Sequence, residues 1–172
     1  MYRLLPDIYQ KDVFSIDYVA LKDAGIKVIL FDLDNTLAGC KEKTPNAQLK
    51  TLFDHIKGLN LIPLIISNQT KKKIAPYKDG LLVSSAYLSF KPLKYKYKKI
   101  MKQYKVKASQ VAAVGDSLVS DVFGANRLGI TSILVDSVGK ELFFKKFVRF
   151  FENRIIGHYR KRGIFEKGVY YE

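Results

Sequence analysis

The chain has one cysteine, Cys40, among its 172 residues. A single cysteine excludes an intrachain disulfide and a cysteine zinc site, and it agrees with a reducing compartment. We interpret Cys40 as a bystander. Long apolar runs are missing too, since none approaches the ~20 residues that a membrane-spanning helix needs. The opening residues carry charges too early and too often for a signal peptide. Together these absences predict a cytoplasmic location.

Acidic residues are few: 16 Asp and Glu stand against 30 Lys and Arg, a net charge of +14. A positive field concentrates anions such as nucleic acid, anionic lipid or phosphorylated small molecules, although it also serves plain solubility. Internal repeats and low-complexity linkers are absent, and a 48% apolar composition excludes a disordered chain. The length suits an ordinary core, so we expect a single domain over residues 1–172.

Short apolar runs alternate with segments of helical spacing. The predicted strands are 27–33, 61–67, 81–84, 110–114 and 131–135. The predicted helices are one that begins near Pro45, one in which Leu93, Tyr97, Ile100 and Tyr104 share a face, and one over 119–128. Continuous apolar strands that alternate with helices are typical of a parallel sheet covered on both faces. The pattern therefore predicts an α/β, Rossmann-like fold.

Polar side chains follow these strands. Asp32 and Asp34 lie at the carboxyl end of the first predicted strand and Ser67 at the end of the second. Lys91 lies a few residues beyond the third, and Asp116 follows the fourth. Ligands of such sheets bind beyond the carboxyl ends of the strands, so these groups should converge. Clustered carboxylates need a cation, and Mg²⁺ combines one or two carboxylates with substrate phosphate. One carboxylate can attack phosphorus while another serves as general acid and base.

Four short segments carry a family resemblance. FDLDNTL at 31–37 resembles the DxDxT signature of the haloacid dehalogenase (HAD) superfamily phosphatases. SNQ at 67–69, Lys91-Pro92 and GDSLVSD at 115–121 resemble the second, third and fourth motifs, in the right order. Residues 3–37 and 115–130, with the FENRI segment near the C-terminus, look like the YqeG-like group of subfamily IIIA. That group is similar to mitochondrial phosphatases that convert phosphatidylglycerophosphate to phosphatidylglycerol.

The resemblance implies roles for the acids. Asp32 would be the nucleophile, which forms an aspartyl-phosphate and binds Mg²⁺. Asp34 would protonate the leaving oxygen and later activate water, with its backbone carbonyl on the metal. Asp116 would complete the metal shell. An acid at position 34 is the phosphatase pattern and argues against the dehalogenase and ATPase branches. Gln69 stands where related enzymes often have Asn, so its role is open.

The resemblance also implies roles for the groups around the phosphate. Ser67 would hold the transferring phosphoryl group, with Asn68 nearby. Lys91 would bind the phosphate and steady the nucleophile, so Ser67 and Lys91 complete the catalytic set. Thr36 would be a supporting residue. Asp121 would either bind Mg²⁺ through water or orient Lys91.

The spacing of the motifs indicates an open site. Members of the superfamily often carry a cap domain after the first motif or between the second and third. Here 29 residues separate Leu37 from Ser67, and 23 separate Ser67 from Lys91. Each gap holds one helix and one strand, so we expect a capless enzyme that admits a bulky substrate. From proximity alone, 41–44 and 71–73 are candidate substrate loops, although lysines 71–73 are interpreted as a solvated face.

Two basic segments bear on the substrate. Residues 91–107 hold eight lysines and no acid, which fits a helix with its lysines in water. Residues 140–162 hold eight Lys and Arg, two Glu and five Phe, a composition typical of an interfacial membrane helix. Its predicted apolar side comprises Phe143, Phe144, Phe147, Val148, Phe150, Phe151, Ile155 and Ile156. This basic amphipathic helix would either pack on the sheet or contact anionic membrane at its inner face.

Three functional hypotheses follow. The leading one is a Mg²⁺-dependent phosphomonoesterase that acts on phosphatidylglycerophosphate at the membrane surface. The second keeps this chemistry with a soluble substrate, such as a nucleotide or sugar phosphate. The third is an RNA- or ribosome-binding protein with a vestigial site, which the charge and the lysine-tyrosine run favour. The presence of every catalytic side chain argues against this third reading.

Overall fold

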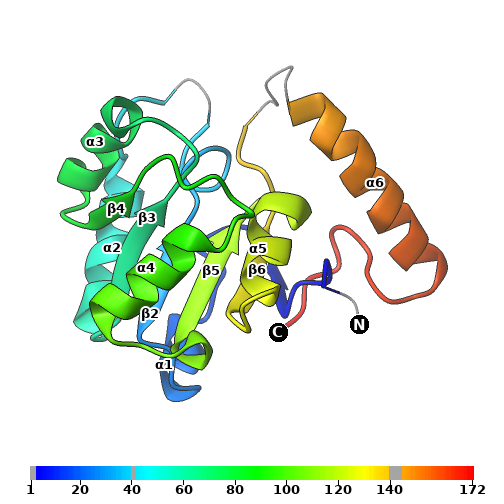
Figure 1. Ribbon diagram of the computed structural model, residues 1–172, viewed down its shortest axis with the longest axis horizontal. Coiled ribbons are helices and arrows are strands. Elements are labelled where there is room, and N and C mark those ends of the chain that lie inside the picture. The colour runs from blue at the N-terminus through cyan, green and yellow to red at the C-terminus, as the bar shows by residue number, and fades with distance from the viewer. Residues whose placement is uncertain (1–2, 40–41, 140–144) are drawn as a thin grey trace.

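The computed structural model describes residues 3–39, 42–139 and 145–172, with only the backbone for 145–149. It contains a six-stranded, all-parallel sheet with the strand order β1-β6-β5-β2-β3-β4 (Figure 1). The strands are β1 Ile8–Gln10, β2 Val28–Phe31, β3 Ile62–Ile66, β4 Ser84–Ala86, β5 Val111–Gly115 and β6 Thr131–Val135. The predicted α/β fold with a parallel sheet is confirmed.

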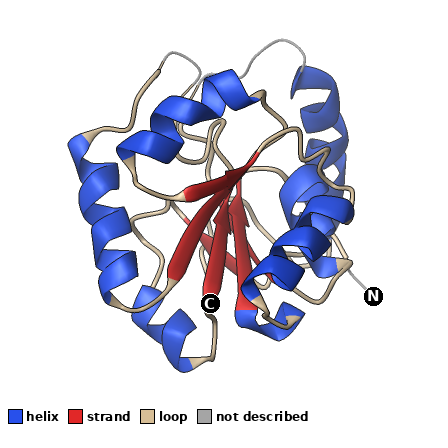
Figure 2. Cartoon of the chain, turned by 60° about the vertical axis from the view of Figure 1, so that its left-hand side comes forward, coloured by secondary structure: helices blue, strands red, loops and turns tan. Residues whose placement is uncertain are grey.

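Helices cover both faces of this sheet (Figure 2). They are α1 Tyr18–Asp23, α2 Ala47–Gly58, α3 Lys71–Gly80, α4 Tyr95–Tyr104, α5 Phe123–Asn126 and α6 Lys145–Lys161. Shorter turns are the 3₁₀ turn η1, Ala108–Gln110, and the π-helical turn η2, Leu118–Val122. Helices α1, α2 and α3 pack with Ile29 and Phe31 on one face, whereas α4 and α5 pack with Val28 and Leu30 on the other. Successive strand residues point to opposite faces, which explains why the strands are apolar throughout.

Helix α2 shows how the sequence sets an element. The side chain of Asn46 accepts a hydrogen bond from the Leu49 amide at 2.9 Å and so caps the helix N-terminus. Leu49, Phe53 and Ile56 then recur on one face and are buried against the sheet. With β3, this helix fills the described chain from residue 42 to Ser67, and α3 with β4 fills the next gap. The expected absence of space for a cap in these described segments is confirmed.

Some sequence predictions were wrong. The strand predicted at 81–84 begins only at Ser84, because Leu81 ends α3 and Leu82 turns the chain with a φ of 53°. Leu93 was predicted to face inward with α4, but it lies in a turn before that helix and is exposed. Strand β1 and helix α1 were not predicted. Tyr171 lies outside the six strands, but its backbone exchanges two hydrogen bonds with the backbone of Tyr9 in β1, at 2.8 and 2.9 Å.

Helix α6 lies beside the β6 and α5 end of the domain (Figure 1). Glu152 and Tyr159 are buried, and Ile155 and Ile156 pack with a small apolar cluster around Tyr9. Phe150 and Phe151 lie outside this cluster and are 58% and 48% exposed. The helix predicted at 140–162 therefore both packs on the domain and exposes phenylalanines. Phe143 and Phe144 lie outside the described residues, as do the side chains of Phe147 and Val148.

Replacement of Phe53 by Ala should lower the free energy of unfolding by about 3–5 kcal/mol, because it leaves a cavity in the core. The Phe53 ring is fully buried and lies 5.0 Å from the ring of Phe31. Urea unfolding monitored by circular dichroism measures the change. The matched control is Phe14→Ala, which removes a half-exposed ring and should shift stability by less than about 0.5 kcal/mol. Equal losses in the two variants would contradict this account of the core.

Candidate active site

The candidate site residues lie where the sequence predicted, at or beyond the carboxyl ends of the strands. Asp32 directly follows β2, Ser67 follows β3 and Asp116 follows β5. The strands are in register here, with Phe31 of β2 beside residues of both β3 and β5. Lys91 arrives from the loop after β4. All four side chains are buried, so the fold brings polar groups from three strand ends and a loop to the same edge of the sheet.

Lys91 lies at the centre of this cluster. Its Nζ atom lies 2.6 Å from Asp32 Oδ1 and 2.6 Å from Asp121 Oδ1. Burial by itself lowers the pKa of Lys91, but the carboxylates of Asp121 and Asp32 outweigh it, so the pKa is raised and the ammonium stays charged. Burial raises the pKa of Asp121; Lys91 opposes this and Asp116 adds to it, so the net direction is upward. Burial and the carboxylate of Asp116 therefore both disfavour the charged form of Asp121, whereas Lys91 favours it.

Three of these acids form a candidate metal centre. Carboxylate oxygens of Asp32, Asp116 and Asp121 lie within 4.8 Å of one another, and all three residues are buried. One ammonium cannot balance three buried carboxylates, and hard oxygen donors suit a divalent cation such as Mg²⁺. The donor set therefore fits the metal that the sequence predicted. It includes the side chain of Asp121, for which the resemblance implied either a water-mediated contact with Mg²⁺ or the orientation of Lys91. The side chain of Asp34 is not in the set, and the resemblance implied only its backbone carbonyl as a ligand.

The turn after β5 explains how Asp121 reaches the cluster. In η2 the Val122 amide donates to the Ser117 carbonyl at 3.2 Å, the wide spacing of a π-helical turn. The carboxylate of Asp121 accepts a hydrogen bond from the Ser117 amide at 3.2 Å and lies over Gly115. A Cβ atom at Gly115 would lie 2.2 Å from Cγ of Asp121. Glycine is therefore required here for the close approach of a side chain.

Asn68 supports Lys91 through the main chain. Its Oδ1 atom accepts a hydrogen bond from the Lys91 amide at 2.7 Å, and its Nδ2 atom donates to the Lys91 carbonyl at 3.3 Å. The side-chain amide of Asn68 thus holds the main chain of Lys91 on both sides. The expectation that Asn68 lies near the substrate phosphate stays a prediction. The hydroxyl of Ser67 accepts from the backbone amide of Gln69 at 3.2 Å. Thr36, the threonine of the first motif, is fully buried.

Asp34 lies at the outer side of the cluster. It sits at the start of a tight turn in which Asn35, with a φ of 65°, donates from its amide to the Ala38 carbonyl at 2.7 Å. Lys73 Nζ donates to Asp34 Oδ1 at 2.5 Å. The interpretation of lysines 71–73 as merely a solvated face was therefore wrong for Lys73. Its position in sequence, 39 residues after Asp34, gave no sign of this pairing.

Two further residues near the site were missed by sequence reasoning. Glu152 of α6 is 2% exposed and accepts hydrogen bonds from Ser117 Oγ at 2.6 Å and from the Val119 amide at 3.1 Å. Ser137, just after β6, donates to Asp116 Oδ2 at 3.0 Å. A signal for Glu152 exists, because it is one of only two acids in the basic segment 140–162. The last helix therefore holds the loop that carries the fourth motif.

Replacement of Glu152 by Ala should lower the free energy of unfolding by about 1–3 kcal/mol, because two partly buried donors lose an acceptor that is itself buried. Thermal and urea unfolding measure the loss. Glu166→Ala is the matched control, since Glu166 pairs with Arg160 at 3.1 Å on the surface and should change stability by less than about 0.5 kcal/mol. If the two variants unfolded alike, Glu152 would not anchor this loop.

Comparisons with known proteins agree with this geometry. Residues 90–141 match the HAD-hydrolase-like family. The chain is 29% identical to the "Probable phosphatase YqeG" of Bacillus subtilis (strain 168), over 92% of this chain and 93% of that protein. It is 24% identical to the "Phosphatidylglycerophosphate phosphatase 1, chloroplastic/mitochondrial" of Arabidopsis thaliana, over 94% of this chain but only 49% of that protein.

A solved structure shares the fold. It is a HAD superfamily (subfamily III A) hydrolase from Legionella pneumophila, with a TM-score of 0.56 and 15% identity. The match covers 69% of this chain and 70% of the other. The family match spans the segment that carries Lys91, Asp116 and Asp121, and the solved structure shares the fold. The chain is therefore similar to phosphatases of the haloacid dehalogenase superfamily.

Proposed function

We propose that the chain is a Mg²⁺-dependent phosphomonoester hydrolase that works through an aspartyl-phosphate on Asp32. The observation that carries the proposal is the buried cluster in which Lys91 contacts Asp32 and Asp121, with Asp116 close by. Burying these charges costs folding free energy, which a bound cation and an anionic ligand would offset. A phosphoryl group and a divalent metal supply both.

The chemistry needs two steps. A carboxylate oxygen of Asp32 attacks phosphorus, the bond from phosphorus to the substrate alcohol breaks, and Asp34 gives a proton to the leaving oxygen. Asp34 then takes a proton from water, whose oxygen attacks the phosphorus of the aspartyl-phosphate. Inorganic phosphate leaves and the Asp32 carboxylate is restored. Lys91 stabilises the negative charge that the phosphoryl oxygens carry, and Ser67 donates a hydrogen bond to one of them.

The metal would be held by Asp32, Asp116 and the backbone carbonyl of Asp34, with Asp121 as a nearby carboxylate. When bound, Mg²⁺ neutralises these acids and draws electron density from the phosphoryl oxygens. Asp121 then has a second task, because its contact with Lys91 fixes the direction of the ammonium. Asn68 fixes the main chain of the same lysine. Both are positioning residues in this proposal.

For the substrate we propose phosphatidylglycerophosphate, presented at a membrane surface. Three features support a lipid over a soluble ester: the lack of space for a cap in the described segments, the +14 charge and the exposed phenylalanines of α6. The name of the Arabidopsis relative points the same way. Among the described residues no helix is long and apolar enough to cross a membrane. A soluble phosphate ester is the alternative substrate for the same chemistry.

Helix α6 is the proposed membrane contact. Phe150 and Phe151 are adjacent and exposed, with ring centroids 5.9 Å apart. The exposed basic residues Arg154, Arg160 and Lys161 lie on the same helix. Exposed aromatic rings beside cations suit the interface of an anionic bilayer, where rings enter the acyl boundary and cations meet the headgroups.

Replacement of Asp32 by Asn should reduce kcat at least about a thousandfold, because the amide cannot serve as the nucleophile. Phosphate release from short-chain phosphatidylglycerophosphate measures it. Chelation of the metal should stop release by the wild type, and added Mg²⁺ should restore it. The control is Asp79→Asn, which changes an exposed acid of α3 and should be fully active. Turnover by Asp32→Asn equal to that of the wild type would refute the mechanism.

The double variant Phe150→Ser, Phe151→Ser should bind anionic vesicles at least about tenfold more weakly, since each buried ring contributes about 1.5–3 kcal/mol. Sedimentation with phosphatidylglycerol-containing vesicles measures the affinity. Phe14→Ser, which changes a half-exposed ring distant from α6 in the sequence, is the control. Unchanged binding in the double variant would exclude this face as the contact.

A further inference from the structure

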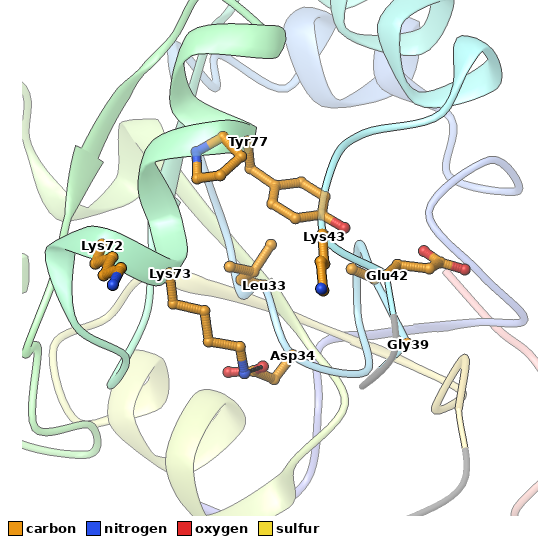
Figure 3. A pocket seen from close by; sticks show the side chains of 10 residues that line it. Leu33, Asp34, Gly39, Glu42, Lys43, Lys72, Lys73 and Tyr77 are labelled. Carbon is orange, nitrogen blue, oxygen red and sulfur yellow. Dashed lines mark hydrogen bonds and ion pairs between the residues drawn. The ribbon is translucent and has the colours of Figure 1, made fainter.

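A pocket of about 550 Å³ opens beside Asp34, between the first turns of α3 and the segment that follows the first motif (Figure 3). Its size is that of a small-molecule site. Asp34 lines it, whereas Asp32, Asp116 and Lys91 do not. In the proposed mechanism Asp34 protonates the leaving oxygen. The pocket therefore adjoins the side of the site from which the substrate alcohol departs.

The charges around this pocket favour an anion. Lys43, Lys72 and Lys73 line it, against the acids Asp34 and Glu42. Lys72 and Lys73 lie in the first turn of α3, which contains no acid. Lysines are unfavourable there, because the N-terminus of a helix already carries partial positive charge. A bound anion would relieve the repulsion among these lysines and the helix end.

Tyr77 supplies an independent sign of a ligand. Its side chain lines the pocket and is 2% exposed, and its hydroxyl has no hydrogen-bond partner among the described residues. Figure 3 shows the hydroxyl pointing toward the side chains of Glu42 and Lys43. Burial, and then Glu42 and Asp34, raise the pKa of Tyr77 to about 12, so the hydroxyl keeps its proton at neutral pH. A buried donor without an acceptor is unfavourable unless a ligand provides one.

We propose that this pocket binds the leaving-group half of the substrate and selects alcohols that carry a second phosphate-type anion. Lys72, Lys73 and the Tyr77 hydroxyl bind that anion, while Leu33 and Pro76 contact the carbon skeleton between the two phosphorus atoms. The inference rests on the proposed function, since it takes the side of the leaving group from the role of Asp34. A phosphodiester one glycerol unit from the scissile phosphate belongs to this class.

Lys73 links the binding of an anion in the pocket to proton transfer by Asp34. In the structure its ammonium is paired with Asp34. An anion in the pocket offers Lys73 a second partner on the leaving-group side. As Lys73 shifts toward that anion, Asp34 becomes available to the leaving oxygen. A substrate without the second charge leaves the pair in place and reacts more slowly.

The test compares glycerol 3-phosphate with glycerol 1,3-bisphosphate, which differ by the second phosphate. Short-chain phosphatidylglycerophosphate is the third substrate, so that a lipid phosphodiester and a free phosphate are told apart. In the wild type, kcat/KM should favour the two doubly charged substrates at least about tenfold. Lys72→Gln and Lys73→Gln should each lower that preference about tenfold. Lys71→Gln, on the same turn but outside the pocket lining, should retain the wild-type preference.

Tyr77→Phe provides a second readout. It removes only the hydroxyl, which has no partner among the described side chains and backbone, so the fold should keep its thermal stability. The KM for the bisphosphate should rise about threefold or more, while that for glycerol 3-phosphate should move less. A drop in thermal stability, with no change in KM, would mean that the hydroxyl serves the fold and not a ligand.

The outcomes separate this inference from the proposed function. An active enzyme whose substrate preference survives Lys72→Gln and Lys73→Gln would overturn the pocket and leave the phosphatase intact. If no ester is hydrolysed, the pocket can still be tested by binding. Titration calorimetry with the Asp32→Asn variant in Mg²⁺ would measure the affinities for the bisphosphate and for glycerol 3-phosphate. Binding of the bisphosphate at least about tenfold tighter than glycerol 3-phosphate, and lost with Lys72→Gln, supports the pocket. Equal binding of the two compounds overturns it.

Discussion

The contact of Lys91 with Asp32 and Asp121 is the interaction on which the rest of the site depends. Three carboxylates gathered at one edge of a sheet would repel each other, and a buried ammonium between two of them makes the cluster tolerable. Much of the surrounding structure holds this lysine or its partners. Asn68 brackets its main chain, and Gly115 leaves space for the carboxylate of Asp121. Glu152 then ties the turn that carries Asp121 to the last helix.

The sequence predicted those parts of the molecule that local patterns determine. Alternating apolar runs and helical spacings led to the parallel sheet, and the strand ends located Asp32, Ser67 and Asp116 correctly. Motif spacing predicted that no cap would fit. These inferences succeed because a buried parallel strand must be apolar, and because ligands gather where such strands end. The chemical roles of the residues came from family resemblance, and they stay predictions that the experiments address.

The features that were missed depend on contacts between distant residues. Strand β1 has only three residues, and its place is set by pairing with β6 more than 120 residues later. The Lys73–Asp34 pair and the bonds of Glu152 also join segments far apart in the chain. From sequence alone, Lys73 at the start of a lysine-rich helix and Glu152 in a basic helix are expected on the surface. Only their partners in the fold, Asp34 and Ser117, show that they have structural contacts. Leu81 was predicted to begin a strand because it is apolar, but it is the C-cap residue of α3.

The exchange of hydrogen bonds between Tyr9 and Tyr171 has a consequence for how the molecule behaves in a crowded solution. Strand β1 is the edge of the sheet, and an uncovered edge is a template onto which a strand from another molecule can add. Here the tail that follows α6 returns to that edge and occupies both backbone groups of Tyr9. Tyr171 thus blocks the pairing of another strand at Tyr9. A shorter tail would expose the backbone groups of β1, an edge at which copies of the chain could associate.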